Sequence, residues 1–251
     1  MTGFPSYEAS IPSLTTEQMV EVDRLMIEEA EISLLQMMEN AGRNLAHLAR
    51  IRFLGGEPRG RAVTVLAGTG GNGGGALVCA RRLHSWGAAV RVVVRSADES
   101  FASVPAHQLR VVRRMGIEVV GPDEVVAHPE PELIVDGVIG YSLRGAPRGP
   151  AASLIRWANA AGAPTLSLDV PSGIDTTTGV AHDPSIRAAA TMTLALPKQG
   201  LRSPGVVPQV GELYLADISV PPELYASPSL GLAVPPIFST SDIVRLPAPS
   251  A

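Results

Sequence analysis

Glycine is concentrated in a short stretch that is suited to binding a phosphate group. Residues 68–76 read Gly-Thr-Gly-Gly-Asn-Gly-Gly-Gly-Ala and lie between a β-prone segment and a segment typical of a helix. Backbone N–H groups and the dipole of a helix N-terminus bind anions at such junctions, and glycines let the main chain approach a ligand closely. We therefore predict a phosphate-binding turn here, with a purely structural tight loop as the alternative.

The same glycines also fit a dinucleotide oxidoreductase. Gly68, Gly70 and Gly73 match the pattern G-x-G-x-x-G. That class of enzyme carries an acidic residue about 20 positions further on, whereas residues 88–95 contain none. Arg91 or Arg95 would instead suit the 2′-phosphate of NADP. An NADP-dependent reductase therefore stays open as a minor alternative.

Two aspartates follow apolar runs and are candidates for acid-base chemistry. Asp136 closes the run 133–135, and Asp169 closes the run 166–168. Ligands bind outside the carboxyl ends of strands in doubly wound sheets, so we expect both carboxylates on the side of the glycine turn, facing it across one crevice. The alternative interpretation makes Asp136 a turn former and Asp169 a loop anchor.

Oxygen-bearing side chains near these strand ends suit a hard cation. Asn72, Asp136 and Ser172 offer amide, carboxylate and hydroxyl oxygens, which favour monovalent or alkaline-earth ions over zinc or copper. Lys198 follows an apolar run and faces either an anionic ligand or solvent. The histidines lack metal-ligand spacing and receive no chemical role: His47, His84, His107, His128 and His182.

Hydrophobic periodicity places these residues on alternating strands and helices. Apolar residues at steps of three and four predict two N-terminal helices, over residues 15–27 and 34–48. Short apolar runs predict strands at 62–67, 90–94, 118–120, 133–136, 165–170, 191–196 and 212–218. Further helices are predicted at 77–86, 103–115 and 151–161. The alternation predicts a doubly wound α/β fold, with a mostly parallel sheet covered on both faces and an N-terminal helical pair.

Length and composition favour one globular domain that binds a small molecule. The 251 residues are 45% hydrophobic and 18% charged with a net charge of -4, which excludes wholesale disorder and offers no electrostatic footprint for nucleic acid or an anionic membrane. We expect a single domain over residues 14–220 and a flexible N-terminus over 1–13. Residues 221–251 include seven prolines and are expected to form an extended tail.

Cysteine usage and the lack of long apolar stretches bear on location. The single cysteine, Cys79, excludes an internal disulfide framework and fits a reducing compartment. The first 13 residues do not resemble a secretory signal, and no run of about 18 apolar residues occurs. We therefore expect a cytoplasmic protein that does not enter a membrane.

Four motifs in a fixed order resemble the NAD(P)H-hydrate epimerase family, also called the YjeF N-terminal domain, which includes the apolipoprotein A-I binding protein. The first is QMMENAG at residues 36–42, the second is the glycine turn, and the third is VDGVIG at 135–140. The fourth is LDVPSGID at 168–175, followed by Gly179, Thr191 and Lys198. The resemblance covers residues 14–218.

The resemblance implies a fold, an activity and a set of site residues. The fold is a Rossmann-like three-layer αβα sandwich, often a homodimer, and the reaction is epimerisation at C6 of hydrated NADH or NADPH, which repairs a damaged cofactor. Asp169 is implied as the catalytic residue, and a potassium ion is implied between Asn72, Asp136 and Ser172. The implied substrate-binding residues are Gly71, Asn72, Gly73, Gly74, Gly75, Gly140, Tyr141, Ser142, Leu143, Arg144, Gly145, Ala146 and Asp169.

Three positions of the glycine turn depart from the family pattern. The family usually reads G-x-G-N-N-G-G-D-G, whereas this chain has Gly71, Gly75 and Ala76 in place of the first Asn, the Asp and the last Gly. Epimerising a carbinolamine carbon needs an acid and a base, and loss of a positioned one costs about 100- to 10,000-fold in rate. The two leading hypotheses are an epimerase-like enzyme in which Asp169 carries the remaining acid-base chemistry, and a non-catalytic nucleotide-binding or scaffold protein of the same fold.

Overall fold

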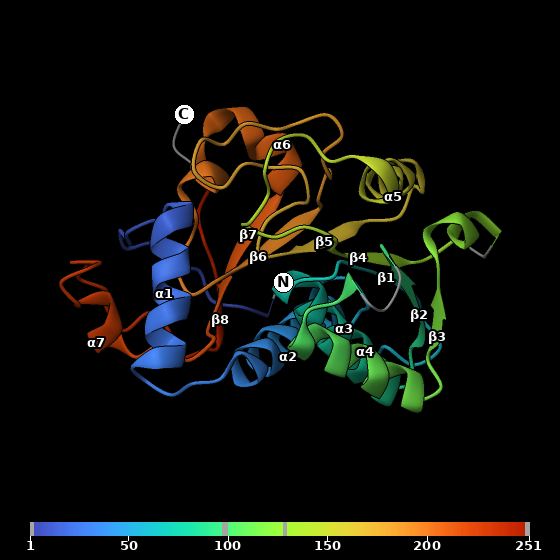
Figure 1. The fold of residues 1–251 in the computed structure, drawn as a ribbon, viewed down its shortest axis with the longest axis horizontal. Helices are drawn as coiled ribbons and strands as arrows, with labels where there is room; N and C mark the ends of the chain where they lie inside the picture. Colours follow the sequence, from blue (N-terminus) through green and yellow to red (C-terminus); the bar gives the residue numbers. More distant parts are fainter. Residues whose placement is uncertain (1–2, 97–99, 128–129, 249–251) are drawn as a thin grey trace.

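The computed structural model describes residues 3–96, 100–127 and 130–248, which fold around one sheet (Figure 1). Eight strands lie in the order β3-β2-β1-β4-β5-β6-β7-β8, and all neighbours are parallel except β7 and β8. The strands are β1 (Ala62–Ala67), β2 (Ala89–Val94), β3 (Glu118–Val120), β4 (Leu133–Gly137), β5 (Thr165–Leu168), β6 (Ala190–Leu194), β7 (Glu212–Ala216) and β8 (Ile243–Arg245). The predicted mostly parallel sheet is confirmed.

Helices cover both faces of this sheet. They are α1 (Thr16–Glu28), α2 (Leu34–Arg52), α3 (Gly71–Ser85), α4 (Ser103–Arg114), α5 (Gly149–Ala160), α6 (Val207–Val210) and α7 (Pro222–Tyr225), with 3-10 turns η2 (Pro122–Ala127), η3 (Gln199–Arg202) and η4 (Pro204–Val206). Figure 1 shows α2, α3 and α4 on one face of the sheet and α5 and α6 on the other. This is the three-layer αβα sandwich that the sequence predicts. Among the described residues, no helix is both long and apolar enough to span a membrane.

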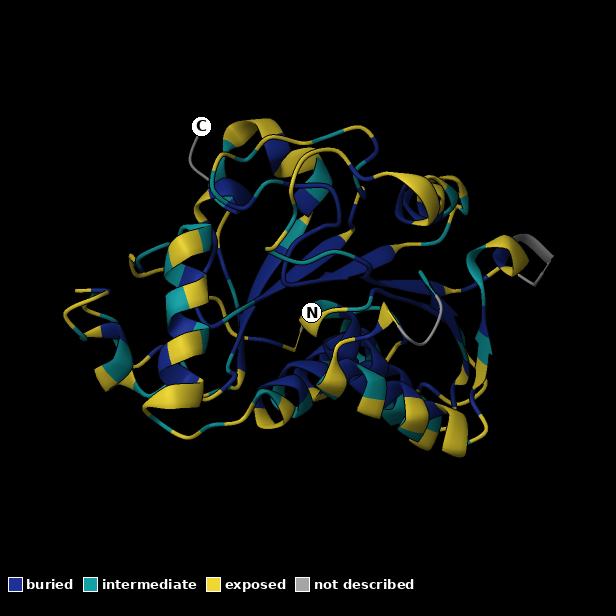
Figure 2. Cartoon of the chain, viewed as in Figure 1, coloured by how far each residue is buried: buried dark blue, intermediate teal, exposed yellow. Residues whose placement is uncertain are grey.

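Alternation along each strand decides which helical layer a side chain meets. Val65 and Val135 join the core cluster that contains α2, α3 and α4. Their neighbours Leu66 and Ile134 join the cluster built on α5. Figure 2 shows the strands as a buried layer between helices whose outer surfaces are exposed. Residues two apart in these strands therefore share a face, and residues one apart do not.

Both N-terminal helices begin at a capping box. The backbone N–H of Gln18 donates to Thr15 Oγ1 at 3.2 Å, and the backbone N–H of Thr15 donates to Gln18 Oε1 at 3.0 Å. Ser33 and Gln36 repeat the arrangement at the start of α2. Each box supplies partners to N–H groups that a helix start otherwise leaves unpaired. The predicted helical pair is confirmed, with α2 extending to Arg52, beyond its predicted end.

Helix α3 begins six residues earlier than the sequence predicts, because most of the glycine stretch is helical. The turn is confined to residues 68–70, and the helix starts at Gly71. Glycine is required at Gly73, where a Cβ would lie 1.9 Å from the carbonyl oxygen of Gly68. The absence of side chains thus allows α3 to start directly against the end of β1.

The strand order reverses at β1, which has β2 on one side and β4 on the other. The Gly68 amide donates to the Gly137 carbonyl at 2.9 Å, so β1 and β4 end at the same level. The connections that leave these two strands diverge at that point, which opens a crevice at the carboxyl edge of the sheet.

The two ends of the chain differ from expectation, because both join the sheet. β8 pairs antiparallel with β7, and its Ile243 and Val244 are buried. Near the N-terminus, Tyr7 donates from its amide to the Arg245 carbonyl at 2.9 Å, and Phe4 is buried. Pairing of this kind shields a strand edge whose N–H and C=O groups would otherwise lack partners. Residues 1–2 and 249–251 lie outside the described residues.

Candidate active site

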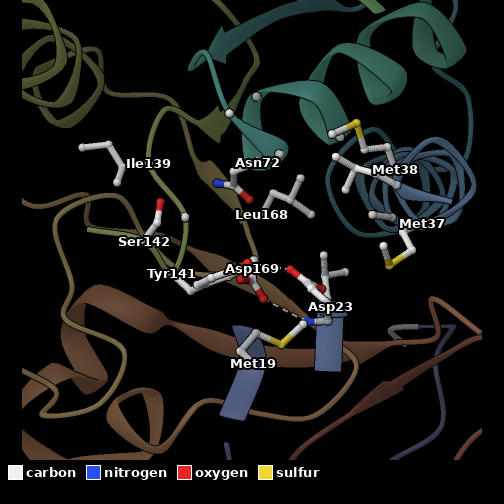
Figure 3. Close-up of a pocket in the computed structure, with 18 of the residues that line it drawn as sticks. Met19, Asp23, Met37, Met38, Asn72, Ile139, Tyr141, Ser142, Leu168 and Asp169 are labelled. Carbon is white, nitrogen blue, oxygen red and sulfur yellow. Dashed lines mark hydrogen bonds between the residues drawn. The ribbon is translucent and has the colours of Figure 1, made fainter. Parts of the chain in front are cut away.

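A cavity of about 410 Å³ lies at the carboxyl ends of β1, β4 and β5, where the sheet order reverses. Its walls come from α1, the start of α2, the start of α3 and the segment that follows β4. Figure 3 shows side chains from these elements converging on one space. The place is the one expected for a ligand in a doubly wound sheet.

The start of α3 forms one wall of the cavity. Gly70, Gly71, Asn72, Gly73 and Gly75 all line it. The N-cap residue is Gly70, which has no side chain to accept from the first N–H groups of the helix. These N–H groups and the positive end of the helix dipole therefore remain available to an anion in the cavity.

Two of the predicted glycines have packing roles. The place of a Cβ on Gly74 is 2.6 Å from Met38 Sδ, and Gly74 is not among the lining residues described. A Cβ on Gly75 would lie 2.7 Å from Leu168 Cδ2. Leu168 thus occupies the space that a side chain at position 75 would enter.

Asp169 directs its carboxylate into the cavity. It directly follows β5, which ends at Leu168, two residues before the predicted end of that strand. The residue has φ 64° and is buried. Its Oδ1 accepts from Lys198 Nζ, from the Leu194 amide at 3.2 Å and from Thr193 Oγ1 at 3.3 Å. A non-glycine residue in the left-handed region needs such support from its surroundings. The carboxylate is therefore held in one position.

Lys198 is fully buried, so of the two alternatives left open for it, the residue facing solvent is wrong. Its ammonium pairs with Asp169 and also donates to the Leu194 carbonyl at 2.9 Å. The backbone around it is anchored to the segment before α1, where Leu14 donates to Pro197 at 2.8 Å. The anionic group that Lys198 contacts is thus the carboxylate of Asp169.

Asp136 does not face the cavity, which corrects the prediction of two aspartates across one crevice. It lies at the expected end of β4, but its neighbours in the sheet are Leu66 and Ser167, on the α5 face. Its oxygens accept from Ser167 Oγ at 2.8 Å, from the Val138 amide at 3.2 Å, and from Ser172 Oγ at 2.6 Å and N at 2.9 Å. Burial raises the pKa of this carboxyl.

The three residues predicted to hold a cation lie around the segment that follows β4. Asp136 and Ser172 are hydrogen-bonded to each other, and Ser172 Oγ also lies 3.2 Å from the Ile139 carbonyl oxygen. Asn72 lines the cavity beside Gly140, where a Cβ would lie 3.1 Å from Asn72 Cβ, and its Nδ2 is buried without a hydrogen-bond partner among the described residues. Among the same residues, no group of three or more His, Cys, Asp or Glu side chains could hold a metal.

Only part of the predicted segment after β4 lines the cavity. Gly140, Tyr141 and Ser142 line the cavity. The described lining leaves out the remaining predicted residues of this segment, which are Leu143, Arg144, Gly145 and Ala146. The wall therefore comes from the first part of the predicted range.

Several lining residues were missed by the sequence analysis, and Asp23 is the most important. It belongs to α1, and its Oδ2 accepts from the hydroxyl of Tyr141 at 2.5 Å. Met19, Asp23 and Ile27 all line the cavity at intervals of four residues, which places them on one helix face. An acid on an otherwise apolar stripe was the available signal. The other missed lining residues are Leu34, Met37, Met38, Ala41, Val138, Ile139, Leu168, Leu194 and Ile218.

The arginines considered for a 2′-phosphate lie in different places. Arg95 lines the cavity and donates to Thr69 Oγ1 at 3.0 Å. Arg91 pairs with Glu118 at 2.9 Å and is not among the lining residues described. None of the histidines in the described part of the chain lines the cavity, and His128 lies outside that part.

An αβα sandwich with a ligand-sized cavity at its strand-order reversal defines the Rossmann-like class of proteins. Within that class, the chain belongs to the NAD(P)H-hydrate epimerase family, since residues 34–200 match the family described as YjeF-related protein N-terminus. A protein of Dehalogenimonas lykanthroporepellens named NAD(P)H-hydrate epimerase is 42% identical over 243 residues, which is 95% of this chain and 94% of that protein.

Two further relatives show the range of the family. A Salinibacter ruber protein named bifunctional NAD(P)H-hydrate repair enzyme is 38% identical over 84% of this chain, which matches 41% of that longer protein. The crystal structure of the yeast protein ynu0 has a TM-score of 0.78 and 26% identity, covering 94% of this chain and 100% of the yeast chain. The resemblance stated from the motifs is confirmed.

Proposed function

We propose that this protein epimerises hydrated NADH or NADPH at C6 of the nicotinamide ring. The observation that carries the proposal is a single cavity bounded by the start of α3 on one wall and the Asp169 carboxylate on another. The N–H groups of α3 would bind the diphosphate, because a helix start without a capping side chain is an anion site. Relatives named as NAD(P)H-hydrate epimerases support the reaction class.

Asp169 is the proposed base. Readdition of water to C6 needs a group that accepts a proton, and a carboxylate within reach of the ring performs that step. The ammonium of Lys198 balances the charge of Asp169 and leaves its Oδ2 without a role in the ion pair, which uses Oδ1. The carboxylate is thus both positioned and able to receive a proton.

A second candidate function is non-catalytic nucleotide binding, and Gly75 is the observation that favours it. Position 75 carries no acid, and Leu168 fills the adjoining space. A protein with this site would bind a nucleotide and leave its C6 configuration unchanged.

A turnover assay separates the two candidates. Purified protein is incubated with one epimer of hydrated NADPH, and the other epimer is followed by chromatography. Asp169→Asn is expected to reduce the rate by about 100-fold or more, because the base is lost. Calorimetry with NADP⁺ reports binding independently. Binding without turnover would favour the non-catalytic candidate, and no heat at millimolar NADP⁺ would count against both.

A potassium ion next to the cavity is also part of the proposal. The residues fit such an ion, because Asp136 is a buried carboxylate whose four hydrogen-bond donors are all neutral groups. Asp136, Ser172 and Asn72 would hold it, and it would neutralise the buried charge beneath the segment that carries Tyr141. A thermal midpoint that rises in potassium more than in lithium buffer would support this assignment.

The homodimer and the cytoplasmic location rest on the family resemblance and on cysteine usage, and both are proposals. Sedimentation of the purified protein would decide the oligomeric state. Fractionation of the source cells would decide the location.

A further inference from the structure

The cavity contains a second carboxylate, which comes from α1. Asp23 and Asp169 both line the cavity, and Figure 3 shows both together with Tyr141 in the same part of it. The two acids are held by different partners. Asp169 is paired with the ammonium of Lys198, whereas Asp23 accepts a hydrogen bond from the neutral hydroxyl of Tyr141. One site therefore holds two carboxyl groups with contrasting surroundings.

The charged and titratable groups around Asp23 set its protonation. Burial raises the pKa of its carboxyl, the negative charge of Asp169 raises it further, and the Tyr141 hydrogen bond and the Lys198 charge oppose the shift. Arg95 lines the same cavity from the end of β2. On α1 itself, Arg24 forms ion pairs with Glu21, Glu28 and Glu29 on the exposed side of the helix. A carboxyl with a raised pKa beside one that is paired with an ammonium is an arrangement that serves acid and base roles.

We propose that Asp23 is the acid that donates a proton to the C6 hydroxyl of the substrate, in place of the carboxyl that position 75 lacks. The inference rests on the proposed epimerase function and extends it to a residue on α1. Leu168 occupies the space next to Gly75, so the acid must come from another element. Asp23 enters the cavity from α1, whereas Asp169 follows β5, so two elements supply the two carboxyl groups.

The proposed step balances without a further reactant. Asp23 passes its proton to the hydroxyl oxygen, the C6–O bond breaks, water leaves, and the ring nitrogen lone pair forms a C=N bond. Water then adds to the other face of C6, the electron pair returns to nitrogen, and Asp169 takes the released proton. The two carboxyls have exchanged protonation states, and proton exchange with solvent restores them. Nothing is oxidised or reduced.

The test compares Asp23→Asn with a matched control, Asp123→Asn, which changes an exposed acid on η2 outside the described cavity. Asp23→Asn is expected to lower kcat for hydrated NADPH by about 100-fold or more, while NADP⁺ binding by calorimetry and the circular dichroism spectrum are unchanged. The control is expected to keep the wild-type kcat. Full activity in Asp23→Asn would overturn the proposal.

Tyr141→Phe gives a readout that a structural role would not move. The lost hydrogen bond stabilises the ionised form of Asp23, so its pKa is expected to rise and the alkaline limb of kcat/KM to move to higher pH. An unmoved limb would overturn the proposal even if Asp23→Asn fails to fold. Wild-type protein that turns over neither epimer would instead overturn the epimerase function, and the role of Asp23 with it.

Discussion

Lys198 and Asp169 form an ion pair at the cavity in which the lysine is completely buried. Of the 20 basic residues in the chain, Lys198 is the only lysine, and all others are arginines. Its ammonium fits between Asp169, Thr193 and Leu194 as a compact charge, where a planar guanidinium would need more room. The pair fixes the charge on one wall of the cavity and distinguishes Asp169 from Asp23, which accepts from the neutral hydroxyl of Tyr141.

Lys198→Met is expected to destabilise the fold. The substitution leaves the Asp169 carboxylate buried without its counter-charge, which costs about 3–5 kcal/mol in the free energy of unfolding. Urea unfolding measures the change. Adding Asp169→Asn to the same chain removes the stranded charge and is expected to recover part of the loss. A single variant as stable as wild type would contradict the prediction.

Gly75→Asp is expected to cost stability because its Cβ would lie 2.7 Å from Leu168 Cδ2. Overpacking of a buried site costs about 1–3 kcal/mol. Thermal unfolding measures this cost. Leu168→Ala makes room for the new side chain, so Gly75→Asp is expected to cost less stability in a Leu168→Ala background than in the wild-type protein. Gly71→Ala is the control, since a Cβ there meets nothing nearer than Met38 Cε at 3.9 Å. A penalty that is the same with and without Leu168→Ala would be the contrary result.

Asp136 is expected to make stability fall with rising pH. Burial raises the pKa of its carboxyl, so its contribution is present below the pKa of the unfolded chain and is lost as pH rises through the folded value. Asp136→Asn should therefore flatten that fall when unfolding is followed by urea across a pH series in sodium buffer.

Asp175→Asn is the comparison variant for the pH series, because Asp175 is expected to change stability with pH in the opposite direction to Asp136. Hydrogen bonds from the Thr178 backbone and side chain lower the pKa of Asp175, so its contribution is present at neutral pH and is lost as pH falls. The Asn variant is expected to lose more stability at neutral than at acid pH. Identical pH slopes in wild type and both variants would contradict the assignments.

Arg95→Ala is expected to weaken binding of NADP⁺ more than binding of NAD⁺. Arg95 lines the cavity at the end of β2, and its Nε is buried without a partner among the described residues. A charge-assisted hydrogen bond to a 2′-phosphate is worth about 1.5–3 kcal/mol, or roughly tenfold or more in Kd. Calorimetry with both nucleotides measures the ratio. Arg91→Ala, which removes a residue that is not among the lining residues described, is the control, and an equal effect of both variants would sink the prediction.

Much of the fold was accessible from the sequence, because it depends on local patterns. Runs such as 62–67 and 118–120 are too short and too apolar to be surface helices, and their predicted bounds equal those of β1 and β3. The capping pairs Thr15 with Gln18 and Ser33 with Gln36 mark helix starts within four residues of chain. The position of Asp169 after a strand also places it at the carboxyl edge, where the cavity lies.

By itself, the sequence determined the order of β1 to β7 and of α1 to α5 along the chain, the α/β class and the family motifs. Tertiary structure alone decided that Asp136 faces α5, that Lys198 is buried on Asp169, that Asp23 enters the cavity from α1, and that both chain ends join the sheet. The physical reason is the distance along the sequence over which each kind of interaction acts. Periodicity and capping act over a few residues, whereas these contacts join segments more than 20 residues apart, and only the packed sheet determines which of them meet.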